Sequence, residues 1–247
     1  MAVEIVSYAN DVALAQGAAT DWLKQLSALF AQPGKAPSAY TAALSGGRIA
    51  KLFCAEIAKQ TSAIPSLKQG AFTNSIHFYW ADERCVPPTD PESNYAIARQ
   101  QLFQPLGVPD SQVHRLRGEE TEPVALRDAL ENIMSRAAVV DGLPVFDVIF
   151  LGMGEDGHVA SLFPGESDSA INDPAVYRAV TAVKPPPRRI TLGYATIAAA
   201  REVWVIASGA GKEGALRASL LADGKTPLAR VIKSRANTRI LTDIVLK

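Results

Sequence analysis

The sequence has few cysteines and no excess of charge of either sign. Its 247 residues include two cysteines, Cys54 and Cys85, which make neither a disulfide framework nor a metal-ligand spacing. Lysine plus arginine number 25, and so do aspartate plus glutamate, so no overall positive charge indicates binding to nucleic acid. We therefore expect a protein of the reducing cytoplasm that does not bind nucleic acid.

Long hydrophobic runs, repeats and low-complexity segments are also lacking. No apolar run approaches the ~18 residues of a membrane span, and the N-terminus has no basic segment typical of a signal peptide. We expect no contact with a membrane. Because no linker or charge block marks a boundary, we expect residues 1–247 to form a single domain.

Short apolar runs alternate with helical patterns along the whole chain. Strands are expected at 3–8, 40–44, 76–80, 147–151, 178–183, 203–207 and 239–245. Helices are expected at 11–30 (capped by Asn10 or Asp11), 49–60, 93–103, 124–139, 196–200 and 212–221. This order predicts an α/β fold with a Rossmann-like, open, mostly parallel sheet and helices on both faces. Other segments are expected to be irregular or are ambiguous: 33–37, 105–122, 165–174 and 190–193.

The stretch 145–165 carries the strongest indication of a site. The apolar run 147–151 is typical of a strand buried in a parallel sheet, and it leads through a turn with three glycines to His158. Open α/β sheets bind ligands at the carboxyl ends of their strands, and a neutral imidazole is well suited to accept a proton near pH 7. We predict an active site here. The other two histidines are expected to be structural: His77 and His114.

The spacing Gly152-x-Gly154-x-x-Gly157 also matches the dinucleotide-binding pattern. That function requires a full helix after the glycines and an acidic residue at the end of the next strand. Here Pro164 limits the helix to about two turns, and the next expected strand ends in Lys184. The context therefore does not favour a dinucleotide site.

Three further polar segments follow expected strands, at 45–48, 82–84 and 184–189. If these strands are parallel, the three segments meet 152–158 at one edge of the sheet. Each segment has a functional and a structural interpretation. Residues 45–48 form either a phosphate cradle at a helix N-terminus or a plain turn.

Arginines and a lysine give the other two segments a possible role in anion binding. Arg84, beside two acids, is placed to hold an anion or lies in a solvated turn. Lys184 and Arg189 stand on a stiff proline-rich loop, which suits phosphate recognition or forms a surface connection. The sequence alone leaves both alternatives open.

Five blocks resemble those of the glucosamine-6-phosphate deaminase/6-phosphogluconolactonase family, in the family's order. They are LSGG at 44–47, DERCVPPTDPESNY at 82–95, LGMGEDGHVASLFPG at 151–165, KPPPRRIT at 184–191 and SGAGK at 208–212. The resemblance implies a fold shared with ribose-5-phosphate isomerase and CoA-transferases. Arg84 and the segment 161–165 favour the lactonase branch over the deaminase branch.

The resemblance implies hydrolysis of 6-phospho-D-glucono-1,5-lactone to 6-phosphogluconate in the oxidative pentose phosphate pathway, without cofactor or metal. His158 would be the general base, Arg84 or a backbone N–H of the glycine turn would stabilise the oxyanion, and Glu155 or Asp156 would orient the imidazole. Substrate and phosphate contacts are expected from Ser45, Gly46, Gly47, Arg48, Asp82, Gly157, Lys184 and Arg189.

Two positions depart from the family pattern. Where the family commonly reads SGGSTP, this chain reads SGGRIA, so Ile49 lacks a hydroxyl and Arg48 adds a charge that could replace it. In the proline-rich block, Arg188 stands where the family has glutamate.

Two other functions share the implied fold: an amino-sugar-phosphate deaminase or isomerase, and a non-catalytic sugar-phosphate sensor. A sensor normally accompanies a DNA-binding segment, and no helix-turn-helix pattern is apparent. We expect a small-molecule lactone as partner, a monomer or weak homodimer, and 165–174 as a candidate lid.

Overall fold

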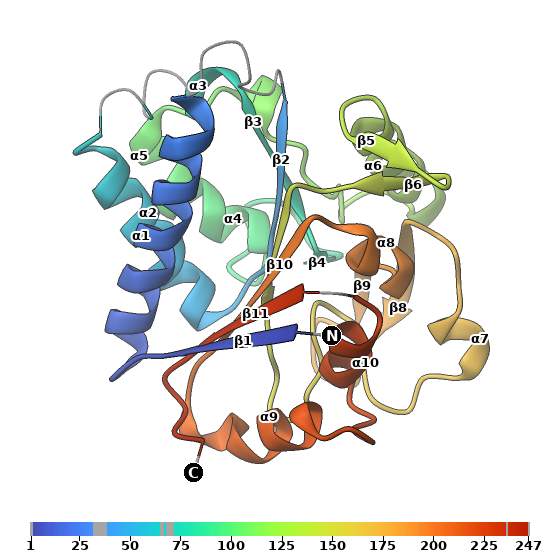
Figure 1. Cartoon of the computed structure of the whole chain (residues 1–247). Helices are drawn as coiled ribbons and strands as arrows, with labels where there is room; N and C mark the ends of the chain where they lie inside the picture. Colours follow the sequence, from blue (N-terminus) through green and yellow to red (C-terminus); the bar gives the residue numbers. More distant parts are fainter. Residues whose placement is uncertain (1, 32–38, 65–66, 68–71, 236, 247) are drawn as a thin grey trace.

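The computed structural model describes residues 2–31, 39–64, 67, 72–235 and 237–246, so the loop expected at 33–37 lies outside the described residues. Its centre is a six-stranded sheet in the order β1-β11-β10-β7-β2-β3, in which every pair of neighbours is parallel (Figure 1). The strands are β1 (Ala2–Ser7), β2 (Tyr40–Leu44), β3 (Ile76–Trp80), β7 (Val148–Gly152), β10 (Glu202–Ala207) and β11 (Asn237–Thr242). The predicted open parallel sheet is confirmed.

Helices flank both faces of this sheet. The long helices α1 (Asp11–Phe30) and α2 (Arg48–Thr61) pack on one side, whereas α8 (Tyr194–Ala199) and α10 (Pro227–Lys233) lie on the other (Figure 1). Asn10 caps α1 as predicted, because its side chain accepts a hydrogen bond from the backbone N–H of Ala13. Within the described residues, no helix combines the length and apolarity needed to cross a bilayer.

The remaining elements are short. They are α3 (Phe72–Asn74), α4 (Asn94–Ala98) continued by a π-helical turn (Arg99–Phe103), α5 (Gln104–Leu106), 3₁₀ turns at Asp110–Gln112 and Ala210–Lys212, α6 (Glu122–Met134), α7 (Asp168–Ile171) and α9 (Glu213–Leu220). Thus α7 lies inside the expected loop 165–174. The helix expected at 93–103 is α4 with its π-helical turn, whereas the end of α5 and a 3₁₀ turn fall in the segment 105–122 that was expected to be irregular.

A second, antiparallel sheet corrects the prediction for 82–84 and 184–189. It contains β4 (Asp82–Arg84), β9 (Arg188–Leu192) and β8 (Tyr177–Thr181), in the order β4-β9-β8. Residues 82–84 are therefore a strand that directly follows β3, whereas 184–187 form the loop between the antiparallel strands β8 and β9, and 188–189 open β9. Ala81 joins the two sheets: its N–H donates to Leu44 O and its carbonyl accepts from Leu192 N, which turns the chain out of the large sheet directly after β3.

The helix expected at 124–139 is wrong at its C-terminal end. Helix α6 ends at Met134, and a two-stranded hairpin follows, formed by β5 (Ala138–Val140) and β6 (Leu143–Val145). The two turn residues, Asp141 and Gly142, both have positive φ, which is the backbone that Asp-Gly adopts in tight hairpins. This dipeptide was the available sequence signal for the hairpin.

The other two histidines, His77 and His114, contact each other beside β3. His114 Nε2 lies 2.9 Å from His77 Nδ1, and the His114 ring stacks on Tyr79 with centroids 4.7 Å apart. Burial, and then the positive charge of Arg136, lower the pKa of His77 and lower that of His114 to about 3. Both contacts are structural.

This histidine pair predicts a loss of stability in mild acid. The unfolded chain binds a proton at His114 near its ordinary pKa of 6.5, whereas the folded chain resists it until about 3. Folding stability is therefore full above pH 6.5 and declines as the pH falls towards 3. For His114→Gln we expect the stability lost between pH 7 and pH 5, measured by urea unfolding, to be smaller by ~1 kcal/mol, allowing for partial exposure. An equal loss in both proteins would contradict this origin.

Candidate active site

A cavity of about 160 Å³ lies where the two sheets meet, at the carboxyl ends of β2, β7 and β10. It is lined by Ser45, Gly46, Gly47, Arg48, Ile49, Asp82, Arg84, Gly152, Met153, His158, Ala160, Arg189, Ser208 and Lys212. The structure thus brings together residues of all four polar segments singled out in the sequence.

The segment after the glycines contains no helix before α7, so the full helix that a dinucleotide site requires is missing there.

The glycine turn after β7 holds His158 at this cavity. A side chain at Gly154 would collide with the imidazole, so only glycine lets the ring take this position. The ring also contacts Phe163, with centroids 5.0 Å apart.

Asp156 orients the imidazole. Its Oδ1 lies 2.6 Å from His158 Nδ1 and also accepts a hydrogen bond from the backbone N–H of His158. Burial raises the pKa of Asp156, but the hydrogen bonds from His158 outweigh it and hold that pKa below its ordinary value. Because the ionised carboxylate can only accept a hydrogen bond, Nδ1 is the donor, and Nε2 is the ring nitrogen that remains to accept a proton.

Glu155 faces a different part of the molecule. A β-carbon on Gly211 would lie 3.1 Å from Glu155 Oε1, and the charge of Glu155 acts on Lys212. The sequence left open which of the two acids orients His158, and the structure places Asp156 there.

The segment after β2 forms the N-terminus of α2. Gly47 is its N-cap with φ of 94°, a left-handed conformation that disfavours other residues, and Ser45 Oγ donates to Phe150 O at 2.8 Å. Arg48, the first residue of the helix, forms an ion pair with Asp11 and donates from Nη2 to Ser208 Oγ at 3.1 Å.

Arg84 and Arg189 form a pair of like charges on the small sheet. They lie directly opposite each other on β4 and β9, an arrangement that is unfavourable unless an anion balances it, and the Glu92 carboxylate, 3.6 Å from Arg84 Nη1, balances part of the charge. Arg84 Nη1 donates to Glu92 O at 2.6 Å, and Arg189 Nε donates to Pro186 O at 3.1 Å. Burial, and then the charge of Arg84, lower the pKa of Arg189. Together these two guanidinium groups can bind an anion.

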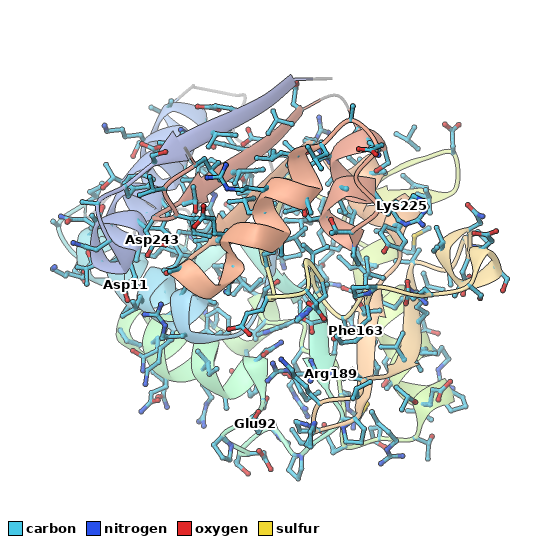
Figure 2. All side chains as sticks on the ribbon, turned by 90° about the horizontal axis from the view of Figure 1, so that it is seen from below. Asp11, Glu92, Phe163, Arg189, Lys225 and Asp243 are labelled. Atoms are coloured by element: carbon cyan, nitrogen blue, oxygen red, sulfur yellow. The ribbon has the colours of Figure 1, made fainter. Side chains whose placement is uncertain are left out.

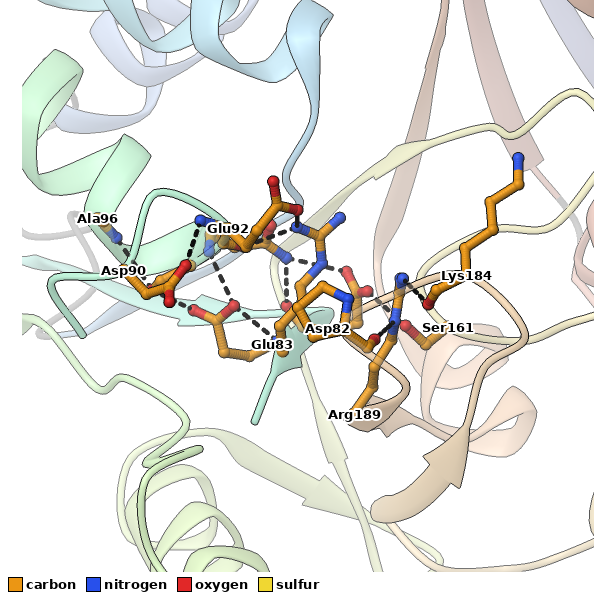
Figure 3. Close-up of polar contacts among 12 residues, drawn as sticks. Asp82, Glu83, Asp90, Glu92, Ala96, Ser161, Lys184 and Arg189 are labelled. Carbon is orange, nitrogen blue, oxygen red and sulfur yellow. Dashed lines mark hydrogen bonds and ion pairs between the residues drawn. The ribbon is translucent and has the colours of Figure 1, made fainter. Parts of the chain in front are cut away.

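The two acids of β4 have different tasks, as Figure 3 shows. Asp82 lines the cavity and accepts a hydrogen bond from Ser161 Oγ at 2.6 Å. Glu83 instead accepts from the backbone N–H groups of Asn94 and Tyr95 at the start of α4. Burial raises the pKa of Glu83 to about 7. It is a structural cap.

Comparison with known proteins supports the resemblance noted in the sequence. The family model described as glucosamine-6-phosphate isomerases/6-phosphogluconolactonase matches residues 9–241. The chain belongs to this family.

Known proteins resemble this chain in sequence, in structure or in both. A protein of Mycobacterium tuberculosis named 6-phosphogluconolactonase is 40% identical over 185 residues, which cover 69% of this chain and 71% of the relative. The structure of 6-phosphogluconolactonase from Trypanosoma brucei is 28% identical, with a TM-score of 0.82 over 98% of this chain and 96% of that chain. A monomeric glucosamine-6-phosphate deaminase, at 19% identity, a TM-score of 0.74 and coverage of 98% and 97%, shows the fold alone.

Two residues expected to bind substrate do not line the cavity. The carbonyl of Gly157 accepts from Leu228 N at 3.1 Å, which ties the glycine turn to α10. Lys184 contributes its backbone carbonyl, which accepts from Arg189 Nη2 at 3.3 Å, while its side chain extends away from that guanidinium (Figure 3). Lys184 lines a neighbouring pocket together with Asp156 and His158, and the substrate contacts expected of Gly157 and Lys184 stay predictions.

Sequence reasoning missed Ser208 and Lys212, which both line the cavity. Burial, and then the charge of Arg48, lower the pKa of Lys212. The signal was present in the family block SGAGK, because glycines after an apolar strand mark the same kind of turn as those around 45–48 and 152–158.

Proposed function

We propose that the chain hydrolyses 6-phospho-D-glucono-1,5-lactone to 6-phosphogluconate, as a 6-phosphogluconolactonase of the pentose phosphate pathway. The observation that carries the proposal is the His158–Asp156 pair, 2.6 Å apart, at a cavity lined by arginine and lysine side chains. The names of the relatives support it.

His158 acts as general base in this mechanism. Its Nε2 takes a proton from a water molecule as that water attacks the lactone carbonyl carbon, and Asp156 keeps Nδ1 protonated and the ring in place. The carbonyl oxygen becomes negatively charged, and Arg84 or a backbone N–H of the glycine turn stabilises it. His158 then returns the proton to the ring oxygen as the C–O bond breaks. A lactone is an activated ester, so the reaction needs no covalent nucleophile.

The positive groups match the two ends of the substrate. At one end of the cavity, the N-terminus of α2 offers the backbone N–H groups of Gly46 and Gly47 beside Lys212, which suits the phosphate. At the other end, the Arg84–Arg189 pair suits the oxyanion and then the carboxylate of the product. The product, 6-phosphogluconate, carries one anionic group for each end.

The test is hydrolysis of freshly generated 6-phosphogluconolactone, with the uncatalysed rate subtracted. We expect a rate far above background and no release of ammonia or fructose 6-phosphate from glucosamine 6-phosphate. Activity on the amino sugar alone would favour the deaminase alternative. Binding of both compounds with turnover of neither would favour the sensor alternative.

A further inference from the structure

Arg48 is a cation at a position where helix electrostatics disfavours one. It is the first residue of the 14-residue helix α2, whose N-terminus carries a partial positive charge. Asp11, the first residue of α1, offsets this charge through an ion pair with Arg48 Nη1. The hydrogen bond from Arg48 lowers the pKa of Asp11, so the carboxylate stays charged.

The same guanidinium reaches the turn that carries Lys212. Arg48 Nη2 donates to Ser208 Oγ, and Ser208 Oγ donates to Asp243 at 2.8 Å. Figure 2, which views the molecule from below, shows Asp11 and Asp243 close together and away from Arg189. Arg48 therefore belongs to the end of the cavity where the phosphate is proposed to bind.

The contact with Asp11 is of a kind that a ligand can replace. The side chain of Arg48 is 63% exposed and that of Asp11 30% exposed, and ion pairs in contact with water add little to stability. A phosphate dianion beside Lys212 and the α2 N-terminus offers guanidinium a stronger, bidentate acceptor than one carboxylate oxygen. Exchange of partners by Arg48 is thus favourable when phosphate binds.

We propose that Asp11 is an exchangeable counter-ion of Arg48, which the phosphate group of the sugar-phosphate substrate displaces when it binds; this rests on the proposed function. Asp11 competes with the phosphate for Arg48. It therefore weakens binding of substrate and product alike and favours release of the product. Asp11 is a positioning residue in this scheme, since it acts through Arg48.

Substitutions at the two positions have opposite expected effects. Arg48→Met removes the cation and raises KM for the lactone roughly ten-fold, with a smaller change in kcat. Asp11→Asn keeps the shape of the side chain, releases Arg48 and lowers KM roughly three-fold. In the double variant, the effect of Asp11→Asn disappears. Glu122→Gln, the same charge change at the exposed first residue of α6, is the matched control and leaves KM unchanged.

A structural role would give a different pattern. If the ion pair only holds the N-termini of α1 and α2 in place, Asp11→Asn raises KM as Arg48→Met does, and the proposal is overturned. An unchanged KM in Asp11→Asn overturns it too. Titration calorimetry with inorganic phosphate as probe separates this proposal from the proposed function, because it needs no hydrolysis. The affinity for phosphate is expected to rise in Asp11→Asn and fall in Arg48→Met even if the lactone is not the substrate.

Discussion

His158→Ala is expected to lower kcat for lactone hydrolysis by ~10²–10⁴-fold, the usual contribution of a general base. The variant loses the imidazole that lines the cavity, whereas the cations proposed to bind the substrate stay in place. KM is therefore expected to change far less than kcat. The measurement is the initial rate at several lactone concentrations, with the uncatalysed rate subtracted and the fold checked by circular dichroism.

The two neighbouring acids provide a sharp control for this result. Asp156→Asn removes the charge that fixes the imidazole and is expected to cost about 10- to 100-fold in kcat. Glu155→Gln removes the same charge one residue away, where the side chain faces Gly211 rather than His158, and is expected to keep kcat near the wild-type value, with any effect through Lys212 falling on KM. Equal rates for wild type and His158→Ala would remove His158 from the mechanism while leaving the reaction itself in place.

Trp22→Ala is expected to lower the free energy of unfolding by ~3–5 kcal/mol, which is a large part of the ~5–15 kcal/mol typical of a domain. Trp22 is fully buried on α1, and its ring meets Phe150 edge-on with centroids 5.2 Å apart. Its Nε1 donates to Tyr40 Oη at 3.3 Å. The substitution leaves a cavity between α1 and β7 and leaves that hydroxyl without its donor.

Urea unfolding followed by circular dichroism measures this effect. Val12→Ala is the matched control, because Val12 lies on the same helix but is 57% exposed, and its removal is expected to change stability little. A loss from Trp22→Ala no greater than that from Val12→Ala would show that the contact between Trp22 and Phe150 does not stabilise the packing of α1 on β7. The folded fraction of the variant is expected to keep its kcat, since Trp22 does not line the cavity.

The parts of the molecule that the sequence predicted are those determined by local patterns. The apolar run before Gly152 and the glycines after it form β7 and the turn to His158, as expected. The cap at Asn10 and the strand Tyr40–Leu44 followed the same logic. Each of these features depends on residues close together in the chain.

The parts that it did not predict depend on distant pairings. Strand β4 has only three residues and pairs with β9, about a hundred residues later, so no periodicity marks it. The choice between Asp156 and Glu155 depends on the path of an irregular turn. The direction of the Lys184 side chain, away from the Arg189 guanidinium, depends on the loop between β8 and β9. The single domain and the monomer or weak homodimer expected from the sequence stay predictions.

The alternation of side chains along β4 limits how this protein can evolve. Asp82 and Arg84 line the cavity while Glu83, between them, holds the start of α4. Inserting or deleting one residue after Trp80 would exchange the two faces of the strand, so that the site and the helix cap would be lost together. Among related sequences, insertions and deletions are therefore expected in the following polar loop, 86–92, and not at the junction between the two sheets.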